Sequence, residues 1–95
     1  MLVTQKIPSL FVGCTAEDID RFSDQFDLGP VIAVADTYEG YDVMMTQPVD
    51  VVIYRAAWDW ASADQFRQTL HEKPWCRYRR FLSVTDHWVM AEIEA

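Results

Sequence analysis

The chain has 95 residues, of which 51% are hydrophobic and 14% aromatic, and its formal net charge at pH 7 is −7. A chain of this length can bury one modest core without disulfides or a metal, so we expect a single domain over residues 1–95. Direct binding of nucleic acid is not expected, because it depends on Lys and Arg side chains that neutralise phosphates. No apolar run approaches the roughly 20 residues that span a bilayer, so no membrane contact is expected.

The two cysteines predict neither a metal site nor a disulfide framework. Cys14 and Cys76 lie far apart, and neither has a cysteine or histidine at a metal-ligand spacing. We therefore expect reduced, mostly buried thiols in a cytoplasmic protein that holds no metal and no cofactor.

The beginning of the chain predicts one strand followed by one helix. Residues Leu2 to Val12 contain a strand that ends at Gly13. Thr15 opens a helix from about Ala16 to Leu28, because its hydroxyl can accept a backbone hydrogen bond and acidic residues follow in the first turn. The buried stripe of this helix comprises Ile19, Phe22 and Phe26.

Three further strands are expected before the second helix. Val31 to Ala35 form a buried apolar run, and Tyr38 to Tyr41 are typical of a turn because Gly40 can adopt a positive φ. The next strand is expected from Asp42 to Thr46. Val49 to Arg55 form the longest β-branched run, which predicts a central strand covered on both faces.

The second half predicts a helix and two more strands. Ser62 to Gln65 resemble a capping box that opens a helix extending to about Glu72. Arg77 to Val84 alternate as a strand does, and Trp88 to Ile93 form the last strand.

The resulting order is β-α-β-β-β-α-β-β. We therefore expect an α+β domain in which two helices pack on one face of an antiparallel sheet. Its topology would be ferredoxin-like or a duplicated βαββ unit. Hydrophobic strands near both ends could lie at sheet edges, so a homodimer is also considered.

Charge is divided unequally along the chain. Residues 1–50 contain nine acidic residues against Lys6 and Arg21, whereas residues 51–95 contain six acidic and six basic residues. An acidic surface of this kind favours a basic protein as the partner.

The predicted first helix carries an acidic face. Four carboxylates, Glu17, Asp20, Asp24 and Asp27, recur at spacings that place them opposite the buried stripe. Such a face is often only a solvated surface, and that interpretation stays open beside partner recognition.

Two tryptophans provide a second candidate feature. Trp58 and Trp60 share a face if the chain is extended, which suits a paired interface anchor, although core filling is the commoner role. The predicted partner-binding residues are Glu17, Asp20, Asp24, Asp27, Asp36, Glu39, Asp42, Trp58 and Trp60.

The sequence favours a binding protein over an enzyme. It contains no Gly-rich phosphate loop, no GxSxG and no HExxH. His71 and His87 have no partner at a spacing that indicates a catalytic or metal site. Arg77, Arg79 and Arg80 could bind a carboxylate or phosphate, or only balance charge.

We therefore expect a small acidic inhibitor of the anti-CRISPR, anti-restriction or immunity type. It would act as a nucleic-acid mimic that occludes, by stoichiometric binding, a basic nucleic-acid-binding surface on its target. The alternative is a homodimeric ferredoxin-like domain that binds or converts a small molecule in a pocket between helices and sheet.

Overall fold

Strands and helices alternate through most of the chain. The computed structural model describes residues 7–26, 28–56, 61–85 and 90–92. The elements are β1 (Ser9–Val12), α1 (Ala16–Gln25), β2 (Val31–Val34), α2 (Thr37–Thr46), β3 (Val51–Arg55), α3 (Ala61–His71), β4 (Arg80–Val84) and β5 (Met90–Glu92). This alternation is typical of an α/β fold with a parallel sheet.

The sheet has the strand order β2-β1-β3-β4-β5. The first four strands are parallel, and β5 alone runs antiparallel to its neighbour β4. The expected antiparallel sheet is therefore wrong, and so are both topologies proposed for it, ferredoxin-like and duplicated βαββ. A crossover helix between two strands carries the chain back to the end of the sheet where the first strand began. The second strand then runs in the same direction as the first, so the two are parallel.

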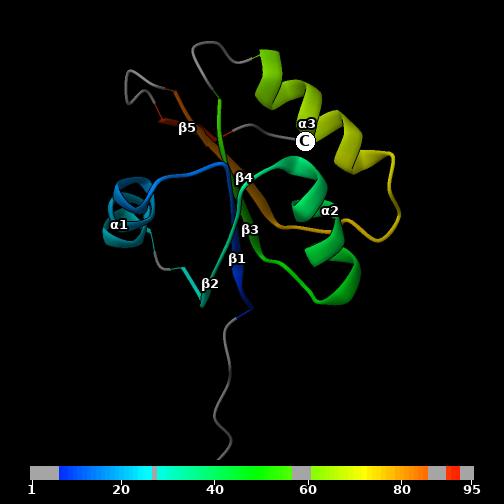
Figure 1. The fold of residues 1–95 in the computed structure, drawn as a ribbon, viewed down its shortest axis with the longest axis horizontal. Coiled ribbons are helices and arrows are strands. Elements are labelled where there is room, and N and C mark those ends of the chain that lie inside the picture. The colour runs from blue at the N-terminus through cyan, green and yellow to red at the C-terminus, as the bar shows by residue number, and fades with distance from the viewer. Residues whose placement is uncertain (1–6, 27, 57–60, 86–89, 93–95) are drawn as a thin grey trace, which may run out of the picture.

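The helices cover both faces of the sheet. Figure 1 shows α1 on one side and α2 with α3 on the other. The expectation of two helices on one face is thus also wrong. Alternate residues of the central strands serve the two layers, as the pleat of a strand requires: Phe11 and Ile53 pack toward α1, whereas Leu10 and Val52 pack toward α2 and α3.

The wrong sheet topology was expected because helix α2 was not predicted. This helix replaces the expected turn at Tyr38–Tyr41 and the expected strand at Asp42–Thr46. Asp36 is the N-cap of α2, and its side chain accepts a hydrogen bond from the backbone N–H of Glu39. Gly40 is buried because α2 lies close to β1 there. A Cβ added at Gly40 would lie 3.4 Å from Val12 Cγ2. Gly40 therefore lies in a helix–sheet contact, where a Cβ would meet β1 at van der Waals distance, and it does not form a turn.

Other predicted elements are confirmed with shifted ends. Thr15 caps α1 in a capping box with Asp18, and β3 lies in the middle of the sheet with its first residues buried. The second helix expected from the sequence is α3, but it begins at Ala61, so Ser62 lies inside the helix and is not its cap. None of the helices in the described ranges is long and apolar enough to cross a membrane.

Candidate partner-binding surface

The strand order identifies where a ligand would be expected. The connection after β1 leads to α1 on one face, and the connection after β3 leads to α3 on the other. In open α/β sheets, ligands bind in the crevice that such a divergence opens at the carboxyl ends of the strands. Among the described residues, Gly13 and Cys14 follow β1, and Arg55 ends β3.

An internal ion pair occupies this crevice. Arg55 Nη1 donates to Asp18 Oδ1 at 2.6 Å and to Oδ2 at 2.8 Å. Asp18 is fully buried and also accepts a 2.8 Å hydrogen bond from the Thr15 backbone N–H. A backbone N–H at the start of a helix is a donor that could serve a bound phosphate. Here the protein's own carboxylate takes that donor, so this part of the crevice does not present a free anion site.

Cys14 lies beside this ion pair, and its thiol is engaged by the backbone. Its thiol lies 3.6 Å from the Val12 carbonyl oxygen and 3.7 Å from that of Ile53, and it donates to them. Burial, and then the negative charge of Asp18, raise the pKa of Cys14 to about 12. This raised pKa disfavours the thiolate, which is the form that attacks a substrate or binds a metal.

We expect Cys14 to resist alkylation in the folded protein. Iodoacetamide reacts with thiolates, so at about pH 8 the native thiol should be labelled far more slowly than the same thiol in urea. Cys76, whose pKa is also raised by burial, should behave alike. Mass spectrometry of peptides from timed samples measures both rates. Labelling of native Cys14 as fast as in urea would contradict the partly buried thiol with a raised pKa.

The raised pKa of Cys14 also predicts how stability depends on pH. Between the ordinary thiol pKa of 9.0 and about 12, the unfolded chain has lost a proton that the folded chain keeps. The stabilisation is therefore complete below pH 9.0 and is lost as the pH rises toward about 12.

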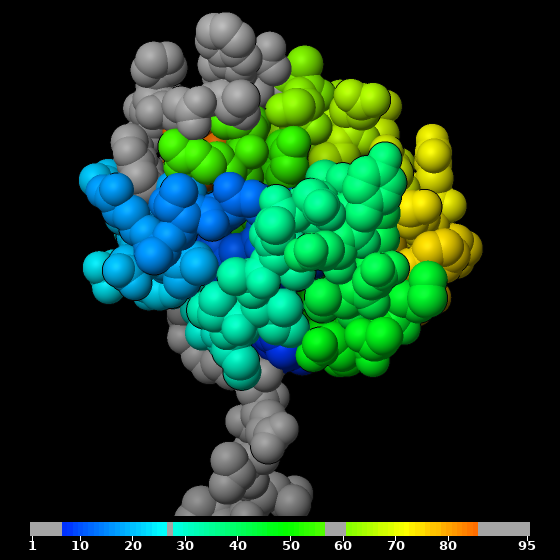
Figure 2. Space-filling view, in the orientation of Figure 1, coloured from blue at the N-terminus to red at the C-terminus, as the bar shows by residue number. Residues whose placement is uncertain are grey.

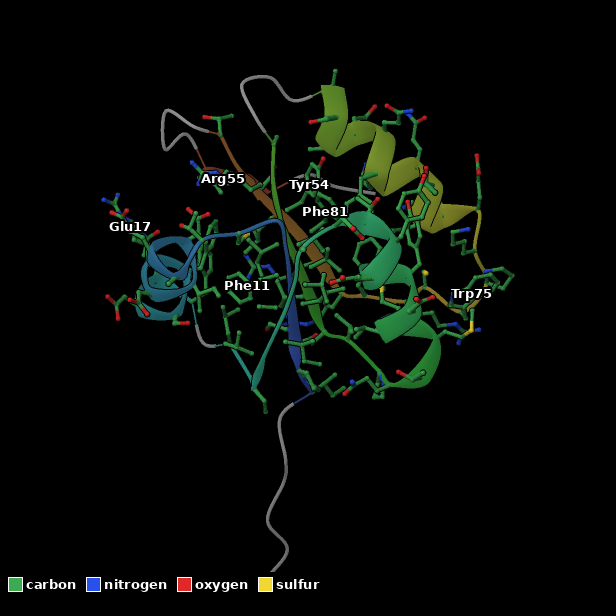
Figure 3. The ribbon with its side chains drawn as sticks, viewed as in Figure 1. Phe11, Glu17, Tyr54, Arg55, Trp75 and Phe81 are labelled. Atoms are coloured by element: carbon green, nitrogen blue, oxygen red, sulfur yellow. The ribbon has the colours of Figure 1, made fainter. Side chains whose placement is uncertain are left out.

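Six of the predicted partner-binding residues are exposed in the structure. Glu17, Asp20 and Asp24 lie on α1, and Figure 3 shows Glu17 pointing away from the sheet. The other three precede or lie on α2. We call these six carboxylates the acidic side: Glu17, Asp20, Asp24, Asp36, Glu39 and Asp42. The remaining predicted residues, Asp27, Trp58 and Trp60, lie outside the described residues.

Some members of the acidic side also support local structure. Asp36 caps α2, and Glu39 Oε2 accepts a 3.0 Å hydrogen bond from the Ala35 backbone N–H. Glu17 forms an exposed ion pair with Arg21 at 2.9 Å. In the described part of the chain, Asp20, Asp24 and Asp42 make no hydrogen bond or ion pair. These three therefore keep their carboxylates available for a partner.

The fold converts the charge division of the sequence into a division of the surface. Residues up to Thr46 form β1 and β2, which lie at one end of the sheet order, together with helices α1 and α2. Later residues form β3, β4 and β5, at the other end, together with helix α3. Figure 2 shows α1 and α2 on one face of the molecule, on either side of β2. The two helices that carry the acidic side thus lie on either side of the β2 end of the sheet.

The arginines near β4 are mostly engaged within the fold. Arg79 donates to both carboxylate oxygens of Asp50 at 2.8 and 3.0 Å, and these hydrogen bonds lower the pKa of Asp50. The Arg80 guanidinium carbon lies 5.4 Å from the centroid of the Phe26 ring. Of the expected ligand-binding trio, the described contacts leave only Arg77 as an unengaged cation. The structure thus favours charge balance for Arg79 and an aromatic contact for Arg80.

Two hollows are lined by residues other than the six carboxylates of the acidic side. One, of about 580 Å³, is lined by Ile7, Met44, Met45, Trp75 and Arg77 among others. The second, of about 450 Å³, lies between α2 and α3. The described side chains contain no group of three residues that could hold a metal ion.

Sequence reasoning missed the Asp18–Arg55 pair and the position of β2 at the end of the sheet order. Asp18 was assigned only to the first helical turn, and nothing local indicates a partner so distant in the chain. Its position at N3 of a capping box was the available signal that it accepts hydrogen bonds. No protein-family model, curated protein or solved structure matches this chain.

Proposed function

We propose that this protein binds a basic surface of a partner protein through its acidic side and blocks that surface stoichiometrically. One observation carries the proposal: six exposed carboxylates lie on α1 or on α2 and its N-cap, the two helices on either side of β2, and the exposed cation of the same described region, Arg21, is paired with Glu17. Exposed carboxylates increase the rate at which a positively charged partner associates, since they act at long range before contact.

The partner class follows from the same charge. Surfaces that bind nucleic acid are rich in Arg and Lys, because these side chains neutralise phosphates. Carboxylates on two helices can occupy such a surface in place of phosphates. The finer proposal is therefore an inhibitor of a nucleic-acid-binding protein, as anti-CRISPR, anti-restriction and immunity proteins are.

The occupied crevice also favours binding over catalysis. Asp18 and Arg55 satisfy each other, and the Cys14 thiol is protonated. Neither feature provides a free base or a nucleophile where the fold would hold a substrate.

The test neutralises two free members of the acidic side. In the D20N/D24N variant we expect association with the partner to slow on the order of tenfold at low salt, with a weaker salt dependence, because surface charges act mainly on the association rate. The partner is first isolated on immobilised wild-type protein, and its association rate is then measured by surface plasmon resonance.

The matched control removes the same charge elsewhere. Asp64 lies on α3 and Glu72 follows it, so the D64N/E72Q variant has the same net charge without touching the acidic side. The control should associate nearly as fast as the wild type. Equal slowing in both variants would show an effect of net charge alone, and no slowing in D20N/D24N would contradict the proposed surface.

The hollow between α2 and α3 supports a second candidate, binding of a small molecule. Its wall includes Tyr41 and Tyr54, whose ring centroids lie 5.8 and 5.0 Å from that of Phe66. The Lys73 ammonium lies 4.9 Å from the centroid of the Tyr41 ring. Aromatic walls with a few polar groups are common in ligand pockets. Neutralising the acidic side on α1 would leave this binding unchanged, which separates the two candidates.

A further inference from the structure

We infer that β2 is a docking strand onto which an extended, basic segment of the partner adds as a further strand of the sheet. The inference rests on the proposed function for the charge of the partner, and goes beyond it in assigning the element and the mode of binding. Addition of a strand to an open sheet edge is an established way of recognising extended segments.

The hydrogen-bonding pattern of β2 leaves one side open. The Ser9 N–H donates to the Pro30 carbonyl oxygen at 2.9 Å, and the Gly13 N–H donates to that of Val34 at 3.0 Å. Because alternate residues of a strand direct their N–H and C=O groups to opposite sides, the ladder with β1 uses the even-numbered residues of β2. The N–H and C=O groups of Val31 and Ala33 therefore point outward from the sheet.

β2 is short, at four residues, but it contains none of the residues that usually protect an edge strand. Such strands carry a charged residue, a proline or a bulge that prevents further pairing. The four residues of β2, Val-Ile-Ala-Val, include none of these, and Pro30 lies just before the strand. Val31 is 44% exposed and Ala33 is exposed, so apolar side chains accompany the open backbone groups.

The charges around the edge identify the occupant. Helix α1 lies on one face of the sheet and α2 on the other, on either side of β2 (Figures 1 and 2), and exposed carboxylates of the acidic side lie on both helices. Side chains of an added strand alternate between the two faces, so Lys or Arg on either face would meet an acidic helix. A second copy of this chain would instead bring two acidic sides together. Charge complementarity therefore selects a basic segment and not a homodimer at this edge.

The experiment uses two synthetic peptides with the wild-type protein. One is a blocked peptide of Lys and Val with Lys on both faces of the extended chain, and the other is the same peptide N-methylated at every residue. Both have the same charge, but only the first can donate backbone hydrogen bonds. Fluorescence anisotropy at low ionic strength should show at least about tenfold tighter binding of the unmethylated peptide, since several backbone hydrogen bonds are lost by methylation.

Two measurements on the protein complete the test. The Val31 and Ala33 amides should exchange with solvent quickly in the free protein and become protected when the unmethylated peptide is bound. The A33P variant removes an outward donor at a place where an edge strand tolerates proline, and A33S is its control. Binding should weaken in A33P and persist in A33S, with circular dichroism to verify that both fold.

The outcomes separate this inference from the proposed function. If both peptides bind equally and the two amides stay unprotected, binding is purely electrostatic, so the docking strand is overturned while the acidic side stands. If neither peptide binds, the acidic side does not recognise basic segments and both proposals fail. Self-association that protects Val31 and Ala33 without peptide would overturn the basic occupant in favour of a second copy.

Discussion

The R55A variant is expected to lose about 3–5 kcal/mol of unfolding free energy, because removing one partner of a buried ion pair leaves the other charge without compensation. Asp18 is fully buried, and the Arg55 side chain is only 20% exposed. The remaining carboxylate would keep its hydrogen bond from the Thr15 N–H but lose both contacts with the guanidinium. Urea or guanidinium titration followed by circular dichroism measures the change.

The exposed pair Arg21–Glu17 provides the control. Both of its side chains are largely exposed, at 48% and 63%, so R21A should change the unfolding free energy by less than about 1 kcal/mol. A second variant, D18N, should be strongly destabilised as well, because it also weakens the cap of α1. If R55A were no less stable than R21A, the described geometry of the crevice would be wrong.

The F22A variant is expected to lose a similar amount, about 3–5 kcal/mol, through lost burial and the cavity that remains. Phe22 is fully buried, and its ring centroid lies 6.2 Å from that of Phe11 and 5.8 Å from that of Phe26. Among the described elements, α1 is the helix that covers this face of the sheet (Figure 1), and Phe22 is its fully buried anchor.

Phe26 is the matched control for Phe22. It caps the end of α1 and is only partly buried, so F26A should have a clearly smaller effect on stability. Both variants are measured by the same denaturant titration. Equal effects of F22A and F26A would contradict the packing of α1 described here. A destabilised α1 would also weaken partner binding, because three members of the acidic side lie on this helix.

Local signals in the sequence predicted the elements whose stability is mainly local. Thr15 and the stripe containing Phe22 predicted α1, because the cap and the helical period lie within one segment. The consecutive apolar residues of β3 predicted a strand covered on both faces, as parallel strands usually are.

The sheet topology was predicted wrongly because one element, α2, was not recognised as a helix. Tyr38 and Tyr41, with Gly40 between them, have strand and turn propensities, and these outweighed the cap formed by Asp36 and Glu39. The expected strands at Val31–Ala35 and Asp42–Thr46 were joined by the expected turn at Tyr38–Tyr41. Two strands joined in this way form a hairpin, and the strands of a hairpin are antiparallel. Recognition of the cap would have given a second strand–helix–strand unit and hence a parallel sheet.

The acidic side was predictable in part, because surface charge on a helix follows from its periodicity. The position of α2 beside β2 was not predictable, because it depends on the sheet order. The ion pair of Asp18 with Arg55 could not be predicted for the same reason, because the two residues meet only when β1 and β3 are neighbours in the sheet. A homodimer stays a prediction, although the strand expected at the N-terminal edge, β1, lies inside the sheet.

The most direct test of the proposed binding surface is chemical-shift mapping. The isotope-labelled protein is titrated with the unmethylated Lys/Val peptide at low ionic strength, and each backbone amide is followed by nuclear magnetic resonance. We predict that the shifted amides cluster in α1, β2 and α2, around the carboxylates of the acidic side. Shifts confined to α3 and β4, or to the hollow beside Trp75, would contradict the account.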